Sequence, residues 1–346
     1  MQIINLNNNL PHKKEEEFLK IDFSNLFDFD FKDKKILDFK TDSNISFLNQ
    51  EDKENYESKL FYITNSLDKN QKILKIEKDT LEPIILINSL KENSTLFSNN
   101  LLIEIKDGVK ASIIEVFVSS SKDSAVFANR VINLGKNASL EYIKNQDISS
   151  SNSLVFACKS IQNDKSNLEI SNFELGDGFI VNSFENKIDS LNVNYELNGL
   201  NKLRDKANTS TLVRTTHNNE NSRSNINYKN SLLDNSRAVV KIKSIVTETG
   251  LYSKAFQNCN SILLSNDAVV FAQPFLEIFI DELEASHGTT TGTLDKDQLY
   301  YLQSRGIKED EAYKILLEAF ESSIKDNLKD EKLKEFLENY KKESFI

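Results

Sequence analysis

The chain has 346 residues, of which 39% are hydrophobic and 28% charged, and its formal net charge is −10. This length suffices for one large domain or two ordinary ones, and the composition is globular rather than disordered. The acidic balance and the lack of a strongly basic stretch argue against a nucleic-acid partner, because such proteins gather lysine and arginine against phosphates.

The sequence also predicts a compartment. The N-terminus lacks the apolar core and small-residue cleavage site of a secretory signal, and no apolar run approaches the ~20 residues of a membrane span. Cys158 and Cys259 lie too far apart in sequence to form a paired-cysteine metal motif, and both are expected to be structural. We therefore expect a cytoplasmic protein with free thiols and no membrane partner.

Residues 1–80 are predicted to form a mixed N-terminal region. After Pro11, the apolar residues Phe18, Ile21 and Phe23 change from helical to alternating spacing within a charge-rich stretch. This change of period predicts a short helix that runs into an extended segment.

Residues 81–283 are predicted to form a β-rich core. In segment 191–197, as in several others, apolar residues alternate with polar ones, and the following dipeptide Asn198-Gly199 has the composition of a turn. Alternation is typical of strands with one face in a core. No long helical pattern interrupts the region, which excludes a sheet of β–α–β units and leaves a sandwich, a barrel or a β-solenoid open.

Residues 284–346 are predicted to form a C-terminal helical subdomain. Asp295 and Gln298 are spaced as in a capping box, and Gly306 suits the position just after a helix end. An apolar stripe after an acidic first turn predicts a second helix, and another stripe predicts a third. The two stripes consist of Ala312, Ile315, Leu316, Ala319 and Phe320, and of Leu333, Phe336, Leu337 and Tyr340.

The sequence contains no complete local motif for catalysis or metal binding. A phosphate-binding loop, a GxSxG elbow and an HExxH pair are absent, so we expect a protein that is not an enzyme. His287, in the stretch EASHGTTTG, is either a histidine at a strand-to-helix corner or a residue that handles a metal or a proton with partners from elsewhere. His217 is expected in a polar loop without a role, and Glu277 and Asp281 as solvated charges.

The segment QPFLEIFIDELEASHGTTTGTLDKDQLYYLQSRGI resembles the signature of the SufB/SufD family of iron–sulfur cluster assembly proteins, and within it the SufD branch. Residues 10–26 and 216–246 resemble two further segments of the family, with Phe18 where tryptophan is usual. Gly288 also favours SufD over SufB. The matching positions of the main signature are Pro274, Leu276, Glu277, Ile278, Asp281, Ser286, His287, Gly288, Thr290, Gly292, Asp295, Tyr301, Leu302, Ser304, Arg305, Gly306 and Ile307.

The resemblance implies a mainly β fold, a right-handed parallel β-helix flanked by a mixed N-terminal segment and C-terminal helices. It also implies a non-catalytic cluster-assembly subunit that pairs with the paralogue SufB through the β-helices. The SufC ATPase would bind the C-terminal helices. The candidate ATPase-binding residues are Leu299, Tyr300, Tyr301, Arg305 and Gly306.

The resemblance further implies that His287 lies near the SufB–SufD interface, where iron entry and nascent cluster assembly are expected. No cofactor should be stably bound to the chain alone, only iron or an iron–sulfur cluster transiently in the complex, and a homodimer is an alternative in isolation. Cys259 is the candidate additional thiol. Ala285 stands where the SufD branch often has cysteine, which removes a thiolate from that position.

Two other functions remain as alternatives. A SufB-like scaffold would hold a cluster alone through Cys259 and His287. A β-helix carbohydrate lyase or hydrolase would use carboxylates such as Glu277 and Asp281. The missing secretion signal and the absence of tryptophan argue against the carbohydrate enzyme.

Overall fold

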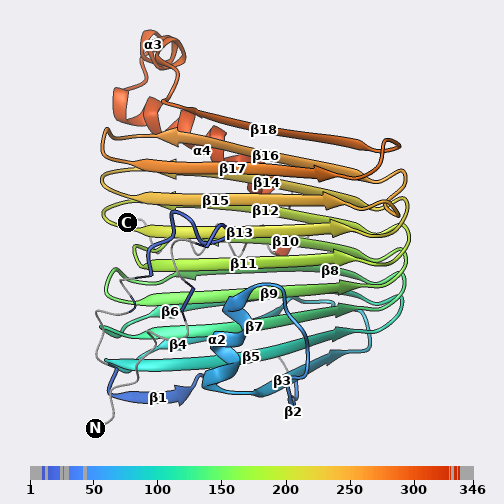
Figure 1. Cartoon of the computed structure of the whole chain (residues 1–346). Helices are drawn as coiled ribbons and strands as arrows, with labels where there is room; N and C mark the ends of the chain where they lie inside the picture. The colour runs from blue at the N-terminus through green and yellow to red at the C-terminus, as the bar shows by residue number, and fades with distance from the viewer. Residues whose placement is uncertain are drawn as a thin grey trace.

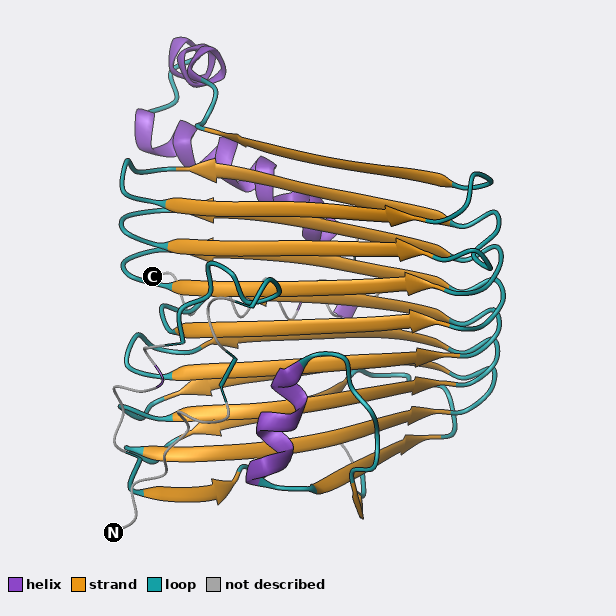
Figure 2. Cartoon of the chain, viewed as in Figure 1, coloured by secondary structure: helices purple, strands orange, loops and turns teal. Residues whose placement is uncertain are grey.

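The computed structural model describes residues 10–11, 15–23, 26, 31–41, 45–326, 328, 331–332 and 334–335. Two sheets face each other and together form a β-solenoid, in which each coil contributes one strand to each sheet (Figures 1 and 2). This architecture confirms the prediction of a mainly β chain built as a parallel solenoid with a helical C-terminal part.

Sheet A contains, in spatial order, β17 (Val269–Ile278), β15 (Arg237–Val246), β13 (Asn208–His217), β11 (Phe179–Ile188), β9 (Ser153–Gln162), β7 (Ala125–Leu134), β5 (Thr95–Ile105), β3 (Asn70–Ile76) and β2 (Leu48–Glu51), with β1 (Asp33–Ile36) beside β5. Sheet B contains β18 (Glu284–Gly292), β16 (Lys254–Leu263), β14 (Arg223–Leu232), β12 (Asn194–Leu203), β10 (Asn167–Glu174), β8 (Ser139–Asp147), β6 (Lys110–Ser119) and β4 (Ile84–Leu90). The helices are α2 (Lys59–Leu67), α3 (Lys296–Ser304) and α4 (Glu309–Asp326).

The corners between strands depend on asparagine and aspartate. Asn137, Asp205, Asn221 and Asp234 all have a positive φ between 53° and 57°. These residues tolerate the left-handed conformation because their short polar side chains bond locally to the backbone. In this sequence, asparagine and aspartate therefore mark the corners between strands more often than glycine does.

Gly199 was predicted as a turn residue, and that prediction is wrong. It lies in the middle of β12, where it pairs with Tyr228 of β14. A Cβ atom at Gly199 would overlap the ring of Tyr228, which is fully buried and reaches the amide of Asn172 on the next strand down, β10. The glycine therefore provides room for a tyrosine ring inside the core.

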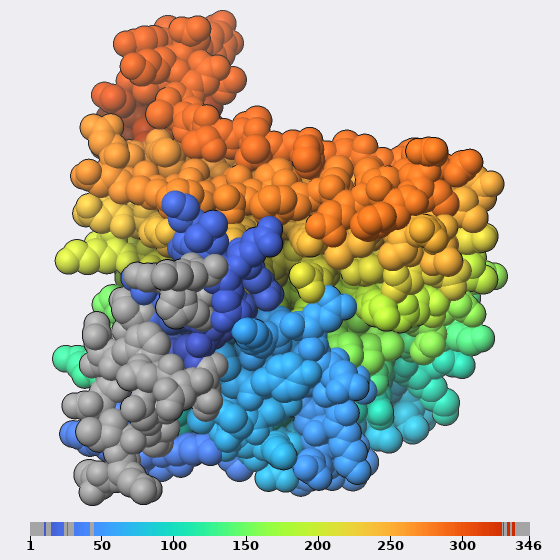
Figure 3. All heavy atoms as spheres, in the orientation of Figure 1, coloured from blue at the N-terminus to red at the C-terminus, as the bar shows by residue number. Residues whose placement is uncertain are grey.

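The N-terminal region differs from its prediction near Phe18. Residues 15–20 form turns rather than a helix, and Lys20 has a φ of 76°. Phe18, Ile21 and Phe23 are buried in a cluster on the outer face of sheet A, where Figure 3 shows the N-terminal segments lying across the strands. The spacing of these apolar residues therefore reflects burial against sheet A rather than a helix that runs into a strand.

The two ends of the solenoid are different. At the N-terminal end, Phe39, Ile45 and Phe47 pack against the core, and the two phenylalanine rings stack. At the other end, β17 and β18 form the last coil, and no described strand pairs with their outer edges. We call this C-terminal end the open end.

The C-terminal helices follow β18, which itself lies within residues 284–346. Asp295 caps α3 by accepting from the backbone N–H groups of Asp297 and Gln298, and Gly306 follows the helix with a φ of 89°, both as predicted. Helix α4 packs on β12 and β14, but Ile315 of its predicted stripe is 40% exposed. Leu333, Phe336, Leu337 and Tyr340 lie outside the described residues.

Candidate functional site

His287 lies in strand β18 at the open end, rather than at a strand-to-helix corner. It pairs in register with Gln257 of β16, just as Ala285 pairs with Ala255 and Thr289 with Cys259. The β16 members of these pairs are buried and face the interior, so His287 is on the interior side of its strand. It is nevertheless exposed, because no described coil covers β18.

Exposed apolar side chains lie around the same end. Phe275 is 46% exposed in β17, and Ile278 and Phe279, at the end of that strand, are 44% and 60% exposed. Ala272, on the interior side of β17, packs only partly against the core. Unpaired edges and exposed apolar groups together are typical of a surface that another chain covers.

Cys259 does not join His287 at the surface. Its side chain is 1% exposed inside the solenoid, where Sγ accepts a hydrogen bond from the Asn230 amide at 3.4 Å. Burial raises the pKa of the Cys259 thiol to about 11, so the thiol is protonated at neutral pH. Its register partner in β18 is Thr289, two residues from His287. Cys158 is also buried, in β9, and burial raises its pKa strongly.

The acidic residues near the open end do not form a catalytic pair. Glu277 is ion-paired with Lys243 at 2.6 Å, and Asp281 follows the end of β17 on the surface. Among the described residues, no group of three or more His, Cys, Asp and Glu side chains could hold a metal ion. His287 is therefore not accompanied at this end by such a group among the described residues.

Helix α3 protrudes beyond the last coil (Figures 1 and 3) and none of its side chains is buried. Tyr300 and Tyr301 are 66% and 59% exposed, and the guanidinium group of Arg305 lies 5.2 Å from the ring centre of Tyr301. A groove of about 440 Å³ runs between α3 and α4, lined by Leu302 and Ile315 among others. Most of this lining is apolar, and it faces solvent.

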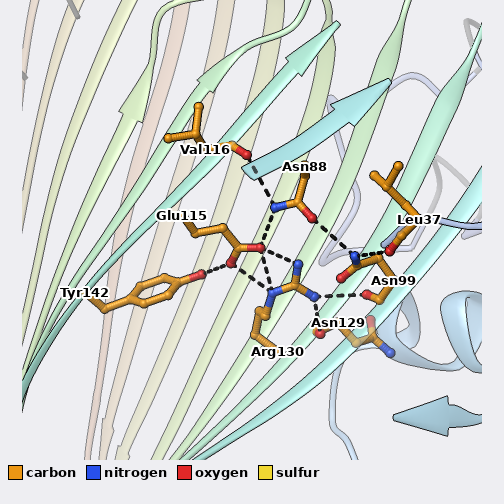
Figure 4. Close-up of polar contacts among 8 residues, drawn as sticks. All are labelled: Leu37, Asn88, Asn99, Glu115, Val116, Asn129, Arg130 and Tyr142. Carbon is orange, nitrogen blue, oxygen red and sulfur yellow. Dashed lines mark hydrogen bonds and ion pairs between the residues drawn. The ribbon is translucent and has the colours of Figure 1, made fainter. Parts of the chain in front are cut away.

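The interior holds polar groups that the sequence analysis did not identify. Glu115 of β6 and Arg130 of β7 form a fully buried ion pair between the two sheets (Figure 4). Asn88 donates to the carboxylate at 2.7 Å, the Tyr142 hydroxyl also donates to it, and Arg130 donates to the Asn99 carbonyl at 2.9 Å. A second buried pair joins Lys144 to Glu174, and burial lowers the pKa of that lysine. In the sequence, each of these charges is a single charged residue between apolar or uncharged strand neighbours.

His217 was predicted in a polar loop, and that prediction is also wrong. It ends strand β13 and is 0% exposed. Its ring nitrogens bond to the hydroxyl groups of Ser222 and Ser224 at 2.6 and 2.8 Å. Burial lowers its pKa to about 4, so the ring is neutral at physiological pH and its place is structural.

No helix among the described residues is long and apolar enough to cross a membrane. Residues 86–320 match the family model described as SUF system FeS cluster assembly, SufBD core domain. This match covers more than half of the chain and includes every strand from β5 to β18.

Three relatives resemble the chain. The iron–sulfur cluster assembly protein SufD of Escherichia coli is 29% identical over 238 residues, which cover 67% of this chain and 55% of that protein. SufD of Plasmodium berghei is 27% identical over 320 residues, or 88% of this chain and 22% of that protein. A SufBD family protein of Pyrococcus horikoshii is 32% identical over 102 residues, or 29% of this chain and 23% of that protein. The chain thus matches about half of the length of the E. coli protein and less of the other two.

Proposed function

The chain belongs to the SufBD core family of the SUF system, which assembles iron–sulfur clusters, and from this membership we propose that it acts as a non-catalytic subunit that pairs with a SufB-like chain and binds a SufC-like ATPase. Iron and the nascent cluster are the cargo of this assembly. The observation that carries the proposal is the open end, where a histidine is exposed on the interior side of β18, whose outer edge pairs with no described strand.

The pairing is supported by the contrast between the two ends. Phe39 and Phe47 cover the N-terminal end, whereas β17 and β18 offer free backbone groups and exposed apolar side chains. Natural sheets usually protect such edges, because they pair readily with other strands. A second solenoid placed end to end would extend both sheets and cover Ala272 and Ile278. In its absence, a second copy of this chain would use the same edges.

The proposed role of His287 follows from its position at this end-to-end interface. A neutral imidazole is a good ligand for iron, but one imidazole cannot hold a metal ion without further ligands. We propose that the SufB-like chain supplies them, including the sulfur ligands. The buried thiol of Cys259 and the methyl group of Ala285 provide no thiolate at the surface of this chain. The same burial disfavours a scaffold that holds a cluster through Cys259 and His287 alone.

The ATPase contact is supported by α3. The helix exposes Tyr300 and Tyr301 beside an apolar groove, and aromatic side chains are frequent anchors of protein interfaces. The sequence has no phosphate-binding loop, so nucleotide chemistry would come from the bound ATPase. Helix α4 connects this contact to sheet B, because it packs on β12 and β14.

The test is co-expression with the SufB-like and SufC-like proteins of the same organism, followed by anaerobic purification and native mass spectrometry. We expect one complex that contains all three proteins. His287→Ala should keep the complex but lower its cluster yield, whereas the neighbouring Ser286→Ala, on the opposite face of β18, should leave both unchanged. A chain that purifies without either partner would refute the subunit assignment, and an unchanged cluster yield would refute the role of His287.

A further inference from the structure

Gln257 lies directly beneath His287 in the stack of strands. The two residues are register partners in β16 and β18, and both are on the interior side of their strands. Neighbouring strands lie about 4.8 Å apart, which places the end of a glutamine side chain within reach of the residue above it. Any hydrogen bond between them would therefore link the exposed histidine to the buried core.

The amide group of Gln257 is held in one orientation. Its Nε2 atom donates to the hydroxyl group of Ser244 at 2.7 Å and to the carbonyl oxygen of Phe275 at 2.9 Å. A backbone carbonyl can only accept, so the nitrogen must be on that side and the amide cannot be flipped. Both N–H donors are thereby used.

The other half of the amide has no partner. Gln257 is 3% exposed, and its Oε1 atom is buried without a hydrogen bond to any described residue. Buried polar atoms are nearly always hydrogen-bonded, so this acceptor calls for a donor. Within the described residues, the ring of His287 has no hydrogen bond either. The Oε1 acceptor of Gln257, which has no described donor, therefore lies on the strand next to that of His287, whose ring N–H has no described acceptor.

We propose that Gln257 is a positioning residue: its Oε1 accepts one ring N–H of His287, fixes the tautomer of the imidazole, and leaves the other ring nitrogen free to face the open end. Histidines that bind metals commonly donate their second N–H to such a carbonyl group. The relevance of this bond to iron or a nascent cluster rests on the proposed function, but the bond itself belongs to this chain alone.

The direct test is nitrogen-15 NMR of the histidine rings in the full chain at about pH 8, where ordinary imidazole is neutral. His287→Ala assigns the signals. We expect a single tautomer for His287 in the wild type and a mixture of tautomers, as in solvated imidazole, in Gln257→Met, which removes the acceptor but nearly keeps the volume. Cys259→Ala is the matched control, because it changes the next interior residue of β16, beneath Thr289, and should leave the tautomer unchanged.

A wild-type spectrum with both tautomers would overturn the inference, even if Gln257→Met failed to fold. A second measurement is iron binding by the purified complex, for which Gln257→Met should lower the affinity about 10-fold. If His287→Ala leaves cluster yield unchanged while the tautomer depends on Gln257, the proposed function fails and the positioning stands. If His287→Ala lowers the yield but Gln257→Met changes neither tautomer nor affinity, only the positioning fails.

Discussion

Arg130 and Glu115 each depend on the other, because neither side chain is exposed to solvent. Removing one partner of a buried pair leaves an uncompensated charge, which typically costs about 3–5 kcal/mol of unfolding free energy. We therefore expect Arg130→Met and Glu115→Leu each to lower the urea midpoint strongly. The double variant should lose much less than the sum of the two, and a fully additive loss would contradict this account of the network in Figure 4.

His217 makes stability depend on pH. Its pKa is about 4 in the folded chain and near 6.5 when unfolded, so the unfolded state takes up a proton first as the pH falls. Above pH 6.5 the ring is neutral in both states, and folding is not opposed by protonation of His217. As the pH falls from 6.5 to 4, the unfolded state binds the proton more readily, and the free energy of unfolding decreases progressively. Linkage gives a loss of about 2 kcal/mol between pH 7 and pH 5.

Urea titrations of the wild type and His217→Gln at the two pH values measure this effect. The variant should be less stable at pH 7, because its amide cannot reproduce both serine bonds, but it should lose about 2 kcal/mol less on acidification. Equal acid sensitivity of the two proteins would assign the effect to other groups.

At the scale of elements, α4 is the link between the solenoid and α3. Glu321 is fully buried and pairs with Lys202 of β12 at 2.9 Å, and Lys229 of β14 donates to the carbonyl oxygen of Phe320. These contacts hold the helix on the outer face of sheet B, where Ile324 joins an apolar cluster. Because α4 also packs against α3, it is the element that joins α3 to these strands.

Glu321→Ala should loosen α4 without unfolding the solenoid. We expect faster amide hydrogen exchange in α4 by the equivalent of about 1–3 kcal/mol, while β12 and β14 keep their protection. Glu318→Ala, one turn earlier on the exposed side of the same helix, is the control. Unchanged exchange in Glu321→Ala would mean that the apolar contacts alone hold the helix.

At the scale of the whole molecule, the open end and α3 are proposed to bind different partners. A substitution on one surface should therefore abolish one interaction and leave the other intact. Ala285→Lys places a charge on the interior side of β18, where a second solenoid would have to bury it. We expect this variant to lose the SufB-like chain in co-purification but to retain the ATPase. Leu81→Lys, at a position that is 90% exposed and remote from β18, should retain both. Loss of both partners in Ala285→Lys would indicate a single shared surface.

The presence of a long β region and the caps of α3 could be predicted because they depend on local patterns. Local patterns could not decide among sandwich, barrel and solenoid, since the pairing of β10 with β8 and β12 is non-local, and the solenoid was predicted only through the family resemblance. Strand β18 was placed in the helical segment because its interior side carries Ala285, His287 and Thr289, without the large apolar residues that mark a core strand. The same absence of a covering layer is what exposes the candidate site.

The role of Gln257 could not be predicted either, because an unpaired acceptor becomes visible only when the strands are stacked. His287 stood out in the sequence through its rarity and its surroundings, whereas the amide beneath it lies thirty positions earlier in an ordinary polar stretch. Sequence motifs identify residues that contact substrates or partners. A residue that supports such a side chain from the neighbouring coil does not form a recognisable motif with it.

Gly199 and Tyr228 have a consequence for how this sequence can change over generations. The ring occupies the space that any side chain at position 199 would need, so a lone substitution of the glycine is blocked while the tyrosine remains. Loss of the tyrosine alone would leave a void above the glycine. A side chain at position 199 therefore requires a smaller residue at position 228 first, and the intermediate sequence would carry that void.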